Sequence, residues 1–424
     1  MRLTDLSRAK AFLVKLLRIV ILSLRGLNED KCHLRASALT FFSLLAVVPI
    51  MAMFFGIARG FGFEKALERQ LLVELKGQEE IVSWIINFAH ALLENTKSGL
   101  LAGIGIIILF WTVILVLGNI ENSFNDIWGI KKSRTVGRKI TDYLSIVLIC
   151  PVLLITSSTV TVLITSQVET LVKYFSFVDM ISPAMFYALG LLPYCILWFL
   201  FTFMYVFMPN GKVNFISGAL AGITAGTIYQ IFQGFYINLQ FYVANYNAIY
   251  GSFAALPLFM IWLQVSWLIV LFGAEISFAH QNVDTYDFET DCLEISHSFK
   301  MLLTLKIVHL LIKHFSRKKN FWNETQIAKK LEISIRLVRR IMYELLESGV
   351  ISEVKMDGDK DTYYQPGLNP KSITIKYVIN ALENQGINSL PVSQSEELTK
   401  ISECLKSFDD LINNSPMNRR LADI

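Results

Sequence analysis

Charged side chains are scarce in this chain of 424 residues. They make up 17% of it, whereas an ordinary soluble domain carries about 25%. Hydrophobic residues reach 53% and gather in long runs without charge. This balance argues against an ordinary soluble protein and favours a membrane protein.

Patterns for metals, disulfides and catalysis are also missing. The five cysteines stand far apart without a Cys-x-x-Cys, and the six histidines form no His-Glu-x-x-His. The chain has no Gly-x-Ser-x-Gly, no phosphate-binding loop and no dinucleotide fingerprint. We therefore expect free thiols, no metal ion, no cofactor and no enzymatic activity.

What the sequence does contain is six apolar runs, each long enough to cross a hydrocarbon layer of roughly 30 Å. The last run has no charge over residues 253–274 and includes a proline, which a membrane helix tolerates. A helical but more highly charged stretch, 59–98, follows the first run. The sequence therefore predicts an all-α polytopic membrane domain over residues 34–280. Its six spans are expected near residues 34–57, 100–118, 143–164, 181–208, 215–240 and 250–275.

The placement of Lys and Arg predicts the orientation of these spans. Eight lie in residues 1–35 and five in residues 131–139, on the same side of the predicted membrane. The loops on the other side hold six, mostly within one long segment. Since loops rich in Lys and Arg stay inside, both termini are expected in the cytoplasm.

Residues 1–33 are predicted to form an amphipathic helix before the first span. Arg8, Lys15 and Arg25 recur near one helical face. Such a helix either lies on an anionic lipid leaflet or caps the protein's own membrane domain. The opposite face carries apolar residues: Phe12, Leu13, Leu16, Val20 and Leu24.

Ionisable residues occur where predicted spans meet the cytoplasmic surface. They could form a polar ring in which an arginine neutralises a carboxylate, or they could be ordinary interfacial anchors. The five residues are Arg35, Glu121, Asp126, Asp142 and Glu275.

The fifth predicted span carries small or polar residues every four positions. Gly218, Gly222 and Gly226 indicate close packing against another helix. Gln230 and Asn238 continue the pattern, and their amides are expected either to bond across helices or to face a wet cavity.

After a linker at 281–298, the chain changes character. Residues 299–388 show the helix, helix-turn-helix and β-hairpin order of a winged helix. Arg336, Arg339 and Arg340 could contact nucleic acid, but the segment from residue 281 onward is slightly acidic, with 19 Lys and Arg against 20 Asp and Glu. This favours contact with a cytoplasmic protein or a second copy over DNA. Residues 389–424 resemble a polar, mobile tail.

Several separated motifs resemble the YihY/BrkB family of bacterial inner-membrane proteins, formerly labelled ribonuclease BN. The motifs begin at Ala36, Phe124, Pro209 and Ala244 and cover roughly residues 34–280. The resemblance implies six membrane helices with cytoplasmic termini. It also implies a transporter-like protein that handles lipids or envelope components, with membrane lipids as partners. The alternatives are a membrane-tethered DNA-binding regulator and a ribonuclease, for which the sequence offers no metal site.

Overall fold

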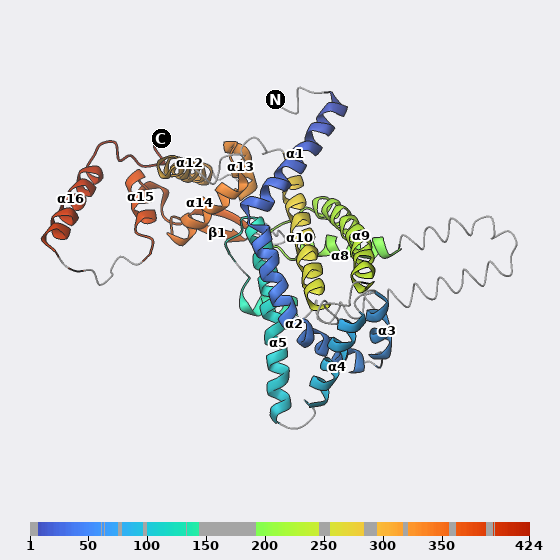
Figure 1. Cartoon of the computed structure of the whole chain (residues 1–424). Coiled ribbons are helices and arrows are strands. Elements are labelled where there is room, and N and C mark those ends of the chain that lie inside the picture. Colours follow the sequence, from blue (N-terminus) through green and yellow to red (C-terminus); the bar gives the residue numbers. More distant parts are fainter. Residues whose placement is uncertain are drawn as a thin grey trace. The chain divides into compact units, whose positions relative to one another are not determined.

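The protein is represented by a computed structural model that separates into two compact units, shown in Figure 1. We call residues 1–128 and 133–281 the membrane unit, and residues 129–132 and 282–424 the C-terminal unit. The longer segment of the C-terminal unit starts at Asn282. The structure describes residues 7–60, 62, 64–74, 79–95, 100–132, 134–143, 192–245, 255–283, 295–316, 321–355, 362–386, 393 and 395–424.

The described part of the membrane unit is built from helices. In chain order they are α1 (Arg8–Glu29), α2 (Cys32–Gly60), α3 (Glu64–Glu74), α4 (Glu79–Asn95), α5 (Leu100–Ile127), α8 (Leu192–Phe207), α9 (Phe215–Asn245) and α10 (Ala255–Asn282). Residues 136–143 are also helical. α2 continues through Pro49.

Three of these helices are long and apolar enough to cross a membrane. They comprise Cys32–Gly60, Phe215–Leu239 and Leu256–Asn282, and contain most of the first, fifth and sixth predicted spans. The second predicted run lies within α5, and the apolar helix Tyr194–Phe207 covers the end of the fourth. Nearly all of the third predicted span, 143–164, lies outside the described residues. The six-span prediction is therefore met in part.

The charged stretch between the first two predicted spans folds into α3 and α4, which pack on α2. Phe55 of α2, Leu67 of α3 and Ile86 of α4 share one buried cluster. Other apolar side chains of α4, Trp84 and Phe88, are more than 60% exposed. The described part of the stretch is helical, as predicted.

α1 is a separate helix because the chain turns at Lys31, which has φ +52°. The last turns of α1 pack against the protein, since Ser23 and Gly26 are buried. The apolar face predicted for this helix is exposed along its length, so the described residues leave it uncovered. The predicted face consists of Phe12, Leu13, Leu16, Val20 and Leu24, and Leu17 and Ile21 are exposed beside it.

The C-terminal unit contains helices and one small sheet. Its elements are α12 (His297–Ser316), α13 (Glu324–Leu331), α14 (Ile335–Glu347), β1 (Ile351–Lys355), β2 (Thr362–Pro366), the 3-10 helix η5 (Pro370–Ser372), α15 (Ile375–Glu383) and α16 (Glu396–Asn413). The two strands pair antiparallel, with Ile351 opposite Pro366. Residues 356–361, between the two strands of the predicted β-hairpin, lie outside the described residues.

Local sequence signals explain the start and end of these helices. The Asn323 side chain accepts a hydrogen bond from the Gln326 backbone N–H, and the Gln326 side-chain oxygen accepts one from the Asn323 backbone N–H. Gly349, just after α14, has φ +71°, a conformation that glycine adopts without strain. The core between the helices holds Ile307, Val338 and Ile341, each fully buried.

The prediction of a mobile tail at residues 389–424 is wrong for its described part. α16 covers Glu396–Asn413, and the Ser395 side chain caps it by accepting from Leu398 N. The chain then returns to the unit: Leu421 N donates to Ile373 O over 3.0 Å, and Ile375 N donates to Arg419 O over 3.1 Å. The polar composition concealed regularly spaced apolar residues and a backbone pairing that local sequence does not reveal.

Candidate polar site at the helix ends of the membrane unit

Glu121 of α5 is a completely buried carboxylate. One of its oxygens accepts a short hydrogen bond from the Tyr143 hydroxyl. The other accepts from Asn125 Nδ2 and from the Arg134 backbone N–H, both at 3.3 Å. Three donors therefore replace water around this carboxylate, which is the condition for burying a charged group.

Arg134 is the cation of this cluster. Its guanidinium donates to the carbonyl oxygens of Phe207 (2.5 Å) and Met208 (3.3 Å), where α8 ends. It also lies 3.3 Å from Asp142 Oδ2 and over the Phe207 ring. The side chain is only 4% exposed. Because carbonyls at a helix C-terminus carry partial negative charge, Arg134 joins the end of α8 to residues 136–143.

Asn125 ties the same cluster to the turn after α8. Its side-chain oxygen accepts from the Asn210 backbone N–H over 2.7 Å. Arg134 reaches Pro209 O at 3.4 Å from the same side. Two motifs that are distant in sequence, around residues 124–129 and 209–210, therefore meet at one point.

Arg35 neutralises a carboxylate, and that carboxylate is Asp126. Nη1 of Arg35 lies 2.5 Å from Oδ2 of Asp126, and this ion pair joins α2 to α5. Nε of Arg35 donates to Asp30 O over 2.7 Å, across the turn between α1 and α2. Both members of the pair remain about one third exposed, so this is an interfacial ion pair.

Glu275 of α10 is 1% exposed and lies against two other helices. The Cys32 thiol, at the start of α2, is 3.7 Å from its Oε1. A Cβ added to Gly26 of α1 would lie only 2.2 Å from its Oε2. Glycine at this position is therefore required for α1 to approach the carboxylate.

The five residues predicted as a ring thus occupy three neighbouring arrangements. Glu121 and Asp142 belong to the Arg134 cluster, Arg35 and Asp126 form a pair, and Glu275 contacts Cys32. The sequence reasoning missed the residues that complete these arrangements. In the sequence, Arg134 indicates only the orientation of the spans, and its position among the five cations of residues 131–139 was the available clue to the cluster. The missed residues are Gly26, Cys32, Asn125, Arg134 and Tyr143.

The glycine stripe of α9 lies along α8. A Cβ at Gly218 would come within 2.5 Å of Val206, one at Gly222 within 2.2 Å of the Thr202 hydroxyl, and one at Gly226 within 2.8 Å of Trp198. A Cβ at Gly234 would meet nothing within 4 Å. The close contact therefore ends between Gly226 and Gly234.

The amides expected to bond across helices are not the ones that do. Asn238 donates to Gly234 O of its own helix over 2.9 Å, and the half-buried Gln230 makes no hydrogen bond within the described part of the chain. Instead, Gln233 of α9 accepts from Trp262 Nε1 over 2.6 Å. Gln264 of α10 donates to Ser37 of α2 over 2.9 Å. Of the two alternatives for Gln230 and Asn238, bonding across helices is not seen in the described part of the chain, and facing a wet cavity stays a prediction.

The arginines of α14 are largely occupied within the C-terminal unit. Arg339 Nε lies 3.0 Å from Glu324 Oε2, and Arg340 lies 3.5 Å from Glu344. Arg336 is half-buried. Only Arg340 is more than half exposed, so α14 presents little free positive charge.

Glu324 also accepts from the Tyr364 hydroxyl over 2.8 Å. Burial, followed by the charge of the Glu324 carboxylate, raises the pKa of Tyr364 well above its usual range. The tyrosine is therefore a neutral donor at every physiological pH. It connects β2 to α13.

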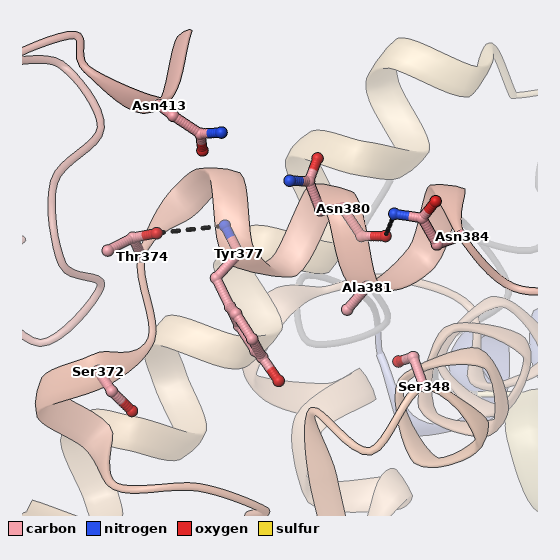
Figure 2. Close-up of a pocket in the computed structure, with 8 residues that line it drawn as sticks. All are labelled: Ser348, Ser372, Thr374, Tyr377, Asn380, Ala381, Asn384 and Asn413. Atoms are coloured by element: carbon pink, nitrogen blue, oxygen red, sulfur yellow. Dashed lines mark hydrogen bonds between the residues drawn. The ribbon is translucent and has the colours of Figure 1, made fainter. Parts of the chain in front are cut away.

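A pocket of about 530 Å³ lies in the C-terminal unit between α15 and the ends of α14 and α16, and Figure 2 shows its lining. Its lining has no charged residue. Two of its hydrogen-bonding groups are used locally: Thr374 caps α15, and Asn384 donates to Asn380 O. The pocket is lined by Ser348, Ser372, Thr374, Tyr377, Asn380, Ala381, Asn384 and Asn413.

Within the described residues, no three His, Cys, Asp or Glu side chains are grouped to hold a metal ion. The Glu121 cluster contains a cation and a phenol beside its carboxylates. That donor set suits hydrogen bonding to a polar group, and we assign it no cofactor.

Residues 23–293 match the family model described as virulence factor BrkB. This is more than half of the chain. The chain belongs to the BrkB family. The match includes every residue of the polar site, from Gly26 to Glu275, so the site lies within the part shared with the family.

Relatives of this BrkB protein are named as membrane proteins. A UPF0761 membrane protein of Paraburkholderia xenovorans (strain LB400) is 25% identical over 377 residues, covering 88% of this chain and 84% of the relative. One from Ralstonia nicotianae (strain ATCC BAA-1114 / GMI1000) is 27% identical, covering 79% of this chain and 74% of the relative. One from Acinetobacter baylyi (strain ATCC 33305 / BD413 / ADP1) is 30% identical, covering 68% and 66%. This chain is accordingly an integral membrane protein.

The alignment with the Paraburkholderia protein extends into the C-terminal unit. It covers 88% of the chain, whereas residues 282–424 are about a third of it. The C-terminal unit of this BrkB protein therefore has a counterpart in at least one relative.

Two solved structures of CymR resemble part of the chain weakly. The protein from B. subtilis, titled a global cysteine regulator, covers 31% of this chain at 22% identity and a TM-score of 0.23. The protein from Staphylococcus aureus covers 30% at 20% identity and a TM-score of 0.22. Both scores are too low for a shared fold to follow.

Proposed function

We propose that this BrkB-family protein is a transporter-like protein that handles a lipid or another amphiphilic envelope component and performs no covalent chemistry. One observation carries the proposal: Glu121 and Glu275, two almost completely buried carboxylates, lie towards the ends of the apolar helices α5 and α10. Ionisable groups in such helices are costly, and they commonly mark a path or a binding site.

The chemistry of the cluster suits a lipid headgroup. Arg134 supplies positive charge, Tyr143 and Asn125 are hydrogen-bonding groups, and Asp142 balances the guanidinium. By the predicted topology these residues lie at the cytoplasmic ends of the helices, at the depth of the headgroups. An amphiphile would place its polar part there and leave its chains in the hydrocarbon.

We extend this proposal to the arrangement in the membrane: six spans in a bacterial inner membrane, with both termini cytoplasmic. Its support is the distribution of Lys and Arg. A reporter fused at Arg134 is expected to read cytoplasmic, and one at Asn247, which lies outside the described residues, to read periplasmic. The opposite pair of results would refute this orientation.

Lipid handling can be tested without knowing the natural substrate. The purified chain is reconstituted into vesicles that carry fluorescent phosphatidylglycerol in both leaflets, and dithionite is added outside. The native protein is expected to make inner-leaflet lipid accessible to the reagent. If the inner half of the dye stays protected, the lipid-handling proposal is wrong.

Glu275→Gln tests whether the buried carboxylate takes part. This variant keeps the size and hydrogen-bonding capacity of the side chain, so we expect normal thermal stability with transfer slowed at least ten-fold. Glu29→Gln, which changes a more accessible carboxylate paired with Arg25, is the matched control and should transfer at the native rate. Equal rates for native and Glu275→Gln proteins would reduce Glu275 to an interfacial anchor.

The alternatives receive less support. For a DNA-binding regulator, α14 would need free cations, but Arg339 is paired and Arg336 is half-buried. We therefore propose that the C-terminal unit is a winged-helix-like module for contact with protein. Mixed genomic duplex at low salt tests this: salt-sensitive micromolar binding, lost in Arg339→Ala/Arg340→Ala, would favour the regulator. For a ribonuclease, no observation speaks in its favour.

A further inference from the structure

α16 exposes an apolar stripe that the described part of the chain leaves uncovered. None of its eighteen residues is buried. The apolar residues follow each other at alternating intervals of three and four positions. This spacing is typical of a coiled coil, in which the apolar stripe of one helix packs against that of another. The stripe consists of Leu398, Ile401, Leu405, Phe408 and Ile412.

The charge of α16 argues against a lipid surface as its partner. The helix carries five acidic and two basic residues, a net charge of −3, which an anionic leaflet repels. α1 has the opposite balance, with five basic residues and one acidic residue. Of the two exposed amphipathic helices, α16 is thus the one suited to a protein partner.

A second α16 fits the stripe. In a heptad with Leu398 at position a, the flanking e and g positions hold one acidic residue each, Asp409 and Glu397, and otherwise neutral residues. In either helix direction, two copies meet without a like-charge pair across the seam. Asp409 is in addition held by Lys376 at 2.5 Å, which fixes α16 to α15 in its own unit.

The exposed area is sufficient for a dimer. The five stripe residues, together with Leu411 and Met417, are 39–70% exposed. With roughly 150 Å² for a large apolar side chain, they leave on the order of 600 Å² uncovered in each copy. A pair would bury about 1,200 Å², the lower bound for stable interfaces. Confinement of both copies to one membrane raises their effective concentration further.

We propose that the protein is a homodimer in which the apolar stripe of α16 pairs with α16 of a second copy. This inference is independent of what the membrane unit handles. Cys404, which is exposed, provides a direct test because it lies at the middle of Glu396–Asn413. A parallel in-register pair and an antiparallel pair centred on the helix both bring the two Cys404 thiols to the same level.

The experiment treats the full-length chain in native membranes with a short bis-maleimide. We expect a crosslinked dimer that disappears in Cys404→Ser, which identifies the reacting thiol. Leu405→Asp places a charge in the seam and should reduce crosslinking at least ten-fold. Ser407→Asp adds the same charge on the opposite face of α16 and should leave crosslinking unchanged.

The mass of the purified chain in detergent, measured by light scattering, supplies a second readout. A native dimer that becomes a monomer in Leu405→Asp supports the proposal. Since no residue of α16 is buried, the variant should keep the native melting temperature. Undiminished crosslinking in Leu405→Asp, or a native chain that is monomeric at every concentration, would overturn it.

Discussion

The membrane unit and the C-terminal unit distribute their side chains in opposite ways. In the membrane unit, Phe199, Ile231 and Phe235 are at least 65% exposed, whereas the charged Glu121 and Arg134 are buried. In the C-terminal unit the core is apolar, and most charges lie on the surface. The membrane unit thus exposes apolar side chains, which suit surrounding hydrocarbon, and the C-terminal unit exposes charged ones, which suit water. α16 is an exception in the C-terminal unit because its apolar stripe is exposed, and we therefore propose a partner for it.

The sharpest test of this comparison uses one helix of the C-terminal unit. Ile307 and Leu302 both lie on α12, but Ile307 is fully buried and Leu302 is 60% exposed. Ile307→Asp should destabilise the unit by about 4 kcal/mol or more, because it buries an unpaired charge. Leu302→Asp should change stability by no more than about 0.5 kcal/mol. Denaturant unfolding followed by circular dichroism measures both, and equal losses would contradict the assigned core.

In the membrane unit, the buried side chain that we compare is the charged Arg134. Arg134→Leu leaves Asp142 and the carbonyls at the end of α8 without their cation, and should cost about 3–5 kcal/mol. Arg138 approaches the same carboxylate at 3.6 Å but is 65% exposed. Arg138→Leu should therefore cost less than about 1 kcal/mol. Thermal melting in detergent compares them, and similar losses would show that burial of Arg134 is unimportant.

The contact between α8 and α9 gives a somewhat smaller effect. Gly222→Leu forces a side chain toward Thr202 and the Trp198 backbone, which should cost about 1–3 kcal/mol. Gly234→Leu, on the same helix and facing open space, is the matched control. If both variants melted alike in detergent, the close approach of α8 and α9 at Gly222 would be disproved.

The smallest effect concerns pH and the C-terminal unit. The pKa of Tyr364 is raised in the folded state, so below the unfolded pKa of about 10 the proton stays bound in both states. Above that pH the unfolded state releases it first, and stability should fall by up to about 1.4 kcal/mol for each pH unit. Tyr364→Phe should remove this contribution. Unfolding midpoints that decline equally in native and variant proteins above pH 10 would contradict the buried tyrosine.

Where the determinants are local, the sequence was sufficient. Asn323 before α13 and Gly349 after α14 are residue types that start and end helices, because a side-chain cap and a positive φ depend on a few neighbouring residues. The sequence also predicted the apolar runs of α2, α9 and α10 and the family. Periodicity likewise indicated the glycine contact of α9, although not where it ends.

Only the tertiary structure decided which polar groups meet. In the sequence, Arg134 is one of five cations in its loop, and only the structure shows that its guanidinium contacts the end of α8. Gln233 rather than Gln230 bonds across helices, because only one of two nearby faces meets α10. The return of the chain after α16 depends on a backbone pairing between Thr374 and Arg420. Composition records how polar a segment is, whereas burial and pairing depend on neighbours that are distant in sequence.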